Sequence, residues 1–216
     1  RLFLRDLSAR YRQSVLGYVW AIVPPVVITL VFTFLKSQRV LSLGDTRIPY
    51  PAYVMGMTTL WHIFASGVQA MARSLVASRG LLEKVNFPRE CLVFAAFGGV
   101  LFDSLLRIAL VILVYVWFGV VPNMSVFFLP TALVPLIVLT TGLGFVLSAA
   151  NVILRDVETA LPLFLGLFMF AVPVIYPPPQ TDPWIIMNDI NPISSLLIAA
   201  YDLTFVGTLT RPTAYL

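Results

Sequence analysis

Long stretches without a charged side chain are the feature that most restricts how this chain can fold. Segments 15–35, 53–72, 126–154 and 159–181 carry no Asp, Glu, Lys or Arg, and segment 91–121 carries only Asp103 and Arg107. A helix needs about 20 apolar residues to cross the hydrocarbon core of a bilayer. We therefore predict an all-α integral membrane protein with these five segments as transmembrane helices in a single domain, 1–216, and a sixth helix expected after the C-terminal end.

The distribution of basic residues predicts the orientation in the membrane. Hydrophobic residues make up 59% of the chain and charged residues 11%, with a net charge of +4. Loops on the cytoplasmic side of membrane proteins are enriched in Lys and Arg. With a cytoplasmic N-terminus, the inside segments hold most of these residues: Arg1, Arg5, Arg10, Arg12, Arg73, Arg79, Lys84, Arg89 and Arg155. This sorting by loop explains the positive charge without a nucleic-acid partner.

The first residues have the pattern of a helix lying on the membrane surface. Leu4, Leu7, Tyr11 and Val15 fall on one helical stripe, and charged residues fall on the other side. We predict an interfacial helix at 1–14 on the cytoplasmic leaflet, either as an anchor or as a lever that responds to a partner. Pro24 and Pro25 predict a break between this helix and the first span.

A polar island, SRGLLEKVNFPRE, occupies residues 78–90 between two apolar segments. It predicts a short cytoplasmic helix, 81–86, that ends before Pro88. One interpretation is an ordinary charged turn, and the other is an element gripped by a soluble subunit.

Closely spaced prolines run from Pro173, in the last part of the fifth apolar segment, to Pro192. The apolar stretches between them are too short to span a bilayer, so residues 177–205 predict re-entrant or interfacial helices on the outer side.

Two patterns inside the spans favour packing roles. Asp103 and Arg107 are one helical turn apart and predict an intramembrane ion pair rather than a proton relay. Gly144 and Ser148 form a small-xxx-small pattern suited to close helix contact. The single cysteine, Cys91, is interpreted as a packing residue.

The sequence lacks the patterns of an ATP site, a metal site or a catalytic centre. Lys36 and Lys84 have no glycine-rich frame to cradle phosphates, and His62 has no partners with metal-ligand or catalytic spacing. We expect no enzyme activity, no cofactor and no metal in this chain. If the protein transports a substrate, we expect the energy to come from a partner.

Four stretches together resemble the membrane (permease) subunit of the ABC-type exporters that move polysaccharides such as O-antigen, capsule and teichoic acid. They are RDLSARYRQSVLGYVWAIVPP (5–25), EKVNFPRE (83–90), NVILRDVETALP (151–162), and PVIYP (173–177) followed by NP (191–192). They occur in the family's order and spacing.

The resemblance implies a homodimer in the bacterial inner membrane that exports a lipid-linked polysaccharide with a cytoplasmic nucleotide-binding ATPase subunit, which would hold the ATP and Mg. It implies that segment 78–90 is the coupling helix, with the ATPase-docking residues Glu83, Lys84, Phe87 and Arg89. The N-terminal helix would gate the cytoplasmic entrance through Arg5, Arg10, Tyr11 and Arg12, and membrane lipids would surround the dimer.

Polymer export would also give the aromatic residues a role, because sugar rings slide over flat side chains. The candidate pore-lining aromatics are Tyr53, Trp61, Phe64, Phe168, Phe170 and Tyr176; packing in the core or in a lipid belt is the alternative for each. Other functions remain open: an ABC exporter of lipids or drugs on the same fold, a membrane-embedded transferase using Asp45, His62, Asp182 or Asp189, or a scaffold.

Overall fold

A computed structural model describes residues 19–39, 44–82, 88–178 and 184–209. These residues form helices joined by turns, and the described part contains no β-strand. The elements are α2 (Val19–Ser37), α3 (Tyr50–Ala77), α4 (Arg79–Leu82), α5 (Arg89–Trp117), η1 (Met124–Phe128), α6 (Leu129–Ile153), α7 (Asp156–Phe168), α8 (Trp184–Ile190), α9 (Pro192–Tyr201) and η2 (Asp202–Val206).

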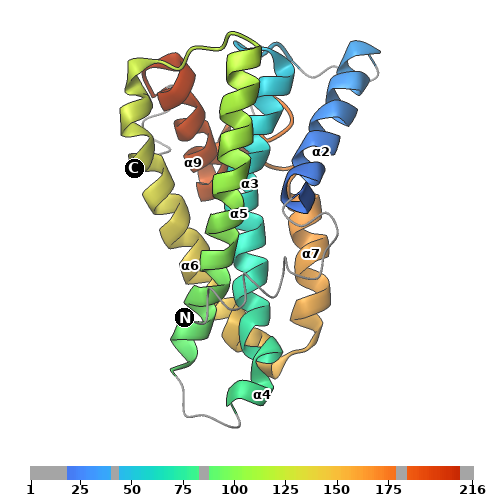
Figure 1. Cartoon of the computed structure of the whole chain (residues 1–216), viewed down its shortest axis with the longest axis vertical. Coiled ribbons are helices and arrows are strands. Elements are labelled where there is room, and N and C mark those ends of the chain that lie inside the picture. The colour runs from blue at the N-terminus through green and yellow to red at the C-terminus, as the bar shows by residue number, and fades with distance from the viewer. Residues whose placement is uncertain (1–18, 40–43, 83–87, 179–183, 210–216) are drawn as a thin grey trace.

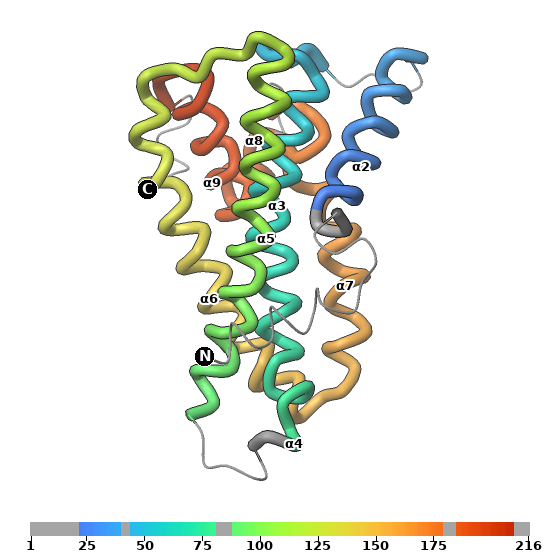
Figure 2. The backbone as a smooth tube through the Cα atoms, viewed as in Figure 1, coloured from blue at the N-terminus to red at the C-terminus, as the bar shows by residue number. Residues whose placement is uncertain are grey.

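Helix α3 is the centre of the bundle (Figure 1). It packs along α5 and α6 over most of its length, and it also contacts α2, α7 and α9. Figure 2 shows α2 and α7 one above the other in a single column beside α3. We call the end of the bundle that carries α4 the α4 end, and the opposite end, where α3 begins at Tyr50, the tyrosine end.

Close contacts explain how α3 lies so near its neighbours. A Cβ atom on Gly67 would lie 2.6 Å from Thr140 Cγ2 and 2.7 Å from Phe97 Cε2, and one on Gly144 would lie 2.5 Å from Met71 Sδ. Small residues at these crossings allow the helices to approach closely, as helices in a bilayer often do. The predicted small-xxx-small contact is therefore confirmed at Gly144.

Two helical stretches in the described part are long and apolar enough to cross a membrane: Arg89–Trp117, and Met124–Ile153, which joins η1 to α6. Their mean hydropathy reaches 2.2 and 2.1, and 28% of each apolar window is buried within the chain. The α2 stretch Ile22–Ser37 and the stretch Pro192–Val206 are shorter apolar helices. Helix α3 is long but carries several polar side chains, which fits its buried, central position.

The fifth predicted span is wrong as a continuous helix. We expected residues 159–181 to cross the membrane, but α7 has only 13 residues and ends at Phe168. Turns follow, and the backbone amide of Val174 bonds to the carbonyl of Val172 at 2.7 Å. Pro173, Pro177 and Pro178 cannot donate the backbone hydrogen bonds that a helix requires, and side chains from α3 bond to the carbonyls of this segment instead.

Other boundaries also differ from the expectations. Helix α2 continues through Pro24 and Pro25, so the described chain has no break at the prolines. Of the short helix expected at 81–86, residues 81 and 82 belong to α4 (Arg79–Leu82), and the rest lies outside the described residues. Two short helices, α8 and α9, lie within the segment predicted to contain short helices, and Asn191 caps α9 by accepting a hydrogen bond from the Ile193 amide at 3.1 Å.

Candidate functional site

Tyrosines of α3 bind the irregular backbone that follows α7. The hydroxyl of Tyr50 donates to the carbonyl oxygen of Ile175 at 2.7 Å. The hydroxyl of Tyr53 lies 2.8 Å from the carbonyl oxygen of Pro173 and 2.7 Å from that of Tyr176. Because these carbonyls are not bonded within a helix, the two hydroxyls supply donors that the buried backbone needs. They hold segment 172–176 against the first turns of α3.

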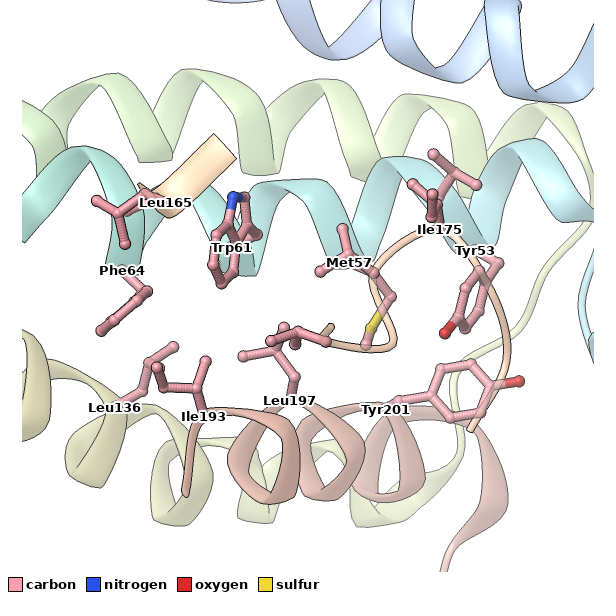
Figure 3. Close-up of a cluster of buried hydrophobic side chains, with 14 of the residues drawn as sticks. Tyr53, Met57, Trp61, Phe64, Leu136, Leu165, Ile175, Ile193, Leu197 and Tyr201 are labelled. Carbon is pink, nitrogen blue, oxygen red and sulfur yellow. The ribbon is translucent and has the colours of Figure 1, made fainter. Parts of the chain in front are cut away.

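Aromatic rings extend this contact toward the C-terminal elements. The ring of Tyr201 meets the ring of Tyr53 edge to face, with centroids 5.3 Å apart. The ring centroid of Phe205 lies 5.3 Å from that of Tyr201 and 5.3 Å from that of Tyr115. Figure 3 shows Tyr53 of α3 and Tyr201 of α9 at the same end of one hydrophobic cluster. The tyrosine end is thus closed by side chains from α3, α5, α9 and η2.

Most of the candidate pore-lining aromatics belong to this one cluster. Tyr53, Trp61 and Phe64 are buried, and Phe168 and Tyr176 pack against the cluster from its edge. The ring of Trp61 lies 5.5 Å from that of Phe64 and 6.1 Å from that of Phe168. Phe170 differs, because 58% of it is exposed. The buried rings could meet a transported chain only after neighbouring elements move.

The α4 end is built from charged side chains around a pocket. Arg73 Nε lies 3.6 Å from Glu158 Oε1, and both side chains are about half exposed. Asn151, which is buried, donates from Nδ2 to the carbonyl oxygen of Ala72 at 3.0 Å and so joins α6 to α3. A pocket of about 300 Å³ opens beside these contacts. Its lining residues, which define the arginine pocket, are Leu75, Val76, Arg79, Arg89, Asn151, Val152, Arg155 and Glu158.

A polar groove of about 450 Å³ lies between α3 and α5. Its polar lining includes His62, Ser66, Gln69 and Arg73 of α3, which lie three or four residues apart and so share a helix face. Ser74, Ser78 and the carboxylate of Asp103 on α5 also line the groove. Small residues of α5, including Ala95, Ala96 and Gly99, leave the groove open on the other side. His62 Nδ1 and Ser66 Oγ are 2.8 Å apart and share a hydrogen bond.

The remaining predicted site residues have mixed outcomes. Asp103 and Arg107 are both buried on α5, and their ion pair stays a prediction. Arg89 begins α5 and lines the arginine pocket. Cys91 is exposed, so its interpretation as a packing residue is wrong; it lies in the first turn of α5, before the helix enters the bundle. Eight candidates lie outside the described residues: Arg5, Arg10, Tyr11, Arg12, Glu83, Lys84, Phe87 and Asp182.

Sequence reasoning missed several residues that organise the two ends. Tyr50, Tyr201 and Asn151 were not candidates, although each makes a contact across the bundle. The proline-rich segment gave a partial signal for the tyrosines, because irregular backbone at membrane depth needs donors from elsewhere. Among the described residues, no group of three His, Cys, Asp or Glu side chains could hold a metal ion.

Comparison with known proteins places the chain in a family. Residues 1–205 match the ABC-2 type transporter family. Two O-antigen export system permease proteins, both named RfbA and from Klebsiella pneumoniae, are each 26% identical over 212 residues, which is 95% of this chain and 79% of theirs. The RfbA permease of Myxococcus xanthus is 30% identical over 176 residues, 82% of this chain and 66% of that protein. The chain is a membrane protein and belongs to the ABC-2 type transporter family.

Proposed function

We propose that this chain is the transmembrane subunit of an ATP-driven exporter that moves a lipid-linked polysaccharide of the O-antigen type out of the cytoplasm. The observation that carries the proposal is the similarity to O-antigen export permeases along 95% of the chain. ATP would be hydrolysed by a separate subunit, and two copies of this chain would form the path across the bacterial inner membrane.

We assign the α4 end to the cytoplasm and the tyrosine end to the outer side. Arg73, Arg79, Arg89 and Arg155 all lie at the α4 end, and the positive-inside rule supports this orientation. Helices α4 and α5 flank segment 83–87, which carries Glu83, Lys84 and Phe87. The ATPase would dock against this segment and Arg89.

Helix α3 gives the two ends a mechanical connection. It is one continuous helix from Tyr50 to Ala77 and ends next to α4. At 1.5 Å per residue, the distance along α3 from Ala77 to Tyr53 is about 36 Å. A displacement of the coupling segment by the ATPase would therefore reach the hydroxyl of Tyr53, whose bonds to segment 172–176 close the outer end.

The substrate path would run along surfaces whose side chains bind sugars only weakly. The polar groove offers hydrogen-bonding groups on His62, Ser66 and Gln69, which suit the hydroxyls of a sugar chain. Phe170 presents an exposed ring, and Tyr176 a partly exposed one, to a chain passing outside the core. Weak, repeated contacts of this kind would let a polymer move along the path without being bound tightly at any one point. The N-terminal residues Arg5, Arg10, Tyr11 and Arg12 would guide the lipid-linked end into the path.

Co-purification tests the proposal most directly. The full-length protein, expressed in its own host, is purified as wild type and as the variants Glu83→Arg and Phe87→Ala. We expect an ATP-hydrolysing subunit to accompany wild type and to be lost from both variants. Arg39→Gln is the matched control, because Arg39 is an exposed cation that follows the C-terminal end of α2, away from the α4 end. If no ATPase accompanies the wild-type protein, the proposed function is wrong.

The substrate is tested in cells. The chromosomal copy is deleted and the variants that pass the co-purification test are returned on a plasmid. We expect polysaccharide to accumulate inside the deletion strain and to reach the surface again with wild type. If surface polysaccharide is unchanged by the deletion while the ATPase still co-purifies, the chain exports a different substrate, such as a lipid.

A further inference from the structure

The arginine pocket has the chemistry of a site for a phosphate ester. Arg79, Arg89 and Arg155 come from α4, α5 and the residue before α7, and they line one pocket of about 300 Å³. The one carboxylate in the lining, Glu158, is already matched by Arg73 at 3.6 Å. With three arginines and one carboxylate, the lining of the pocket is positive by residue type. Guanidinium groups bind phosphate oxygens through paired hydrogen bonds and are the usual choice for this task.

Asn151 adds a second requirement for the ligand. Its side chain is only 1% exposed and lines the same pocket. The contact from Nδ2 to the carbonyl of Ala72 fixes which way the amide is turned, because the reverse orientation would place two oxygens together. Its Oδ1 is left buried and without a hydrogen-bond partner among the described residues. Buried acceptors are nearly always satisfied, so a ligand at this position should donate a hydrogen bond.

The walls of the pocket are apolar and continue onto a lipid-facing surface. Leu75, Val76 and Val152 line it, and 60% of Val152 is exposed. The next two residues, Ile153 and Leu154, are 80% and 61% exposed. A molecule that placed a charged head in the pocket could therefore rest its hydrocarbon chains on this apolar strip. The arrangement of cations at the membrane surface beside exposed apolar side chains is typical of a site for an anionic lipid.

We propose that the arginine pocket binds the phosphodiester head group of a lipid that also carries a hydroxyl group. Arg89 and Arg155 hold the phosphate beside Arg79, Asn151 Oδ1 accepts a hydrogen bond from the hydroxyl, and the strip from Val152 to Leu154 holds the hydrocarbon chains. Two lipids share this chemistry: a hydroxylated anionic phospholipid of the cytoplasmic leaflet, and a lipid carrier that bears a sugar. The site rests on the membrane position of the α4 end, and only the second lipid depends on the proposed function.

Lipid titration of the purified full-length protein, followed by native mass spectrometry, tests this site. The probes are phosphatidylglycerol, phosphatidylmethanol, phosphatidylcholine and a polyprenyl diphosphate that carries one sugar. We expect phosphatidylglycerol to bind more tightly than phosphatidylcholine, which is zwitterionic and has no hydroxyl. It should also bind more tightly than phosphatidylmethanol, which has the same singly charged phosphodiester but no hydroxyl. Tighter binding of the polyprenyl diphosphate sugar than of phosphatidylglycerol would identify the carrier as the natural ligand.

Variants locate the binding. Arg155→Gln removes one cation from an exposed position and should weaken phosphatidylglycerol binding about fivefold, the effect of one basic residue near an anionic lipid surface. Arg39→Gln makes the same charge change away from the pocket and should leave binding unchanged. The proposal is overturned if phosphatidylglycerol and phosphatidylcholine bind alike, if phosphatidylmethanol binds as tightly as phosphatidylglycerol, or if Arg155→Gln has the effect of Arg39→Gln. These outcomes do not depend on whether an ATPase co-purifies.

Discussion

The tyrosine end and the α4 end of the bundle are held together in different ways. At the tyrosine end, buried hydroxyls of α3 bond to backbone carbonyls 120 to 125 residues away, and aromatic rings fill the space between. At the α4 end, the ion pair between Arg73 and Glu158 is half exposed, and the surrounding arginines border an open pocket. Buried, satisfied contacts define one geometry, whereas exposed charges can change partners at little cost. The first end is suited to closing the bundle and the second to accepting other molecules.

Removal of the Tyr53 side chain should have the largest effect on this contrast. Tyr53→Ala loses a buried ring as well as the hydrogen bonds to segment 172–176. We expect a loss of about 3 to 5 kcal/mol in the free energy of unfolding, the range for large-to-small changes in a core. Denaturant unfolding in detergent measures it. A loss below the effect of an exposed control, such as Phe170→Ala, would show that the tyrosine end is not the firmer region.

Filling the close crossing between α3 and α6 should have the next largest effect. Gly144→Ala places a methyl group where Met71 now lies, 2.5 Å from its sulfur. Since the methionine side chain is flexible but buried, we expect a cost of about 1 to 3 kcal/mol for overpacking. Gly142→Ala is the control, because no atom lies within 4 Å of a Cβ at that position. Equal stability of the two variants would contradict the close contact.

Removal of a single hydroxyl separates hydrogen bonding from packing at the tyrosine end. Tyr50→Phe keeps the ring in place but removes the hydroxyl, so the carbonyl oxygen of Ile175 loses its hydrogen-bond donor. We expect a loss of about 1 to 3 kcal/mol, the cost of an unsatisfied buried group. Tyr53→Phe should cost at least as much, because its hydroxyl serves two carbonyls. Thermal unfolding of the two variants side by side gives the order, and the reverse order would argue against the shared hydrogen bond.

The smallest effect on stability is expected at the α4 end. Arg73→Gln removes the exposed ion pair with Glu158 and should change the free energy of unfolding by about 0 to 1 kcal/mol, with less effect at high salt. If the α4 end binds partners, substrate export by the same variant should fall even though its stability is almost unchanged. Stability is measured by thermal unfolding at low and high salt. A large, salt-independent loss would mean that both ends are built for rigidity.

The sequence predicted the elements that depend on local composition. Segments 91–121 and 126–154 correspond to α5 and to the stretch Met124–Ile153, because continuous apolar runs of that length have few alternatives in a bilayer. The same reasoning extended α7 too far, since hydropathy does not distinguish a helix from irregular backbone that other side chains satisfy. The partners of Pro173 and Tyr176 lie on α3. The proline-rich segment signals that donors from elsewhere are needed, but one sequence does not say which residues supply them.

The residues of the candidate site also differ in whether local composition or a distant contact determines their role. Arg89 was named as an ATPase-docking residue from the family resemblance, and that role stays a prediction. The cluster of arginines around it is what the orientation rule predicts for a cytoplasmic end. Asn151 could not be predicted as a site residue, because its role depends on its hydrogen bond to the carbonyl of Ala72 and on the open pocket beside it. Neither can be read from the sequence. Cys91 shows the converse: its residue type favours burial, but its place at the start of α5 leaves it exposed.

The long separation between Tyr53 and its carbonyl partners has a consequence for biosynthesis. Helix α3 leaves the ribosome well before residues 173–176 exist, and at about 5 to 20 residues per second the delay is on the order of ten seconds. During that interval two phenolic hydroxyls lack their final acceptors and depend on water or lipid head groups at the bilayer surface. Insertion of the later segments is therefore the step that completes this end, and a protein truncated before residue 173 would leave it permanently unsealed.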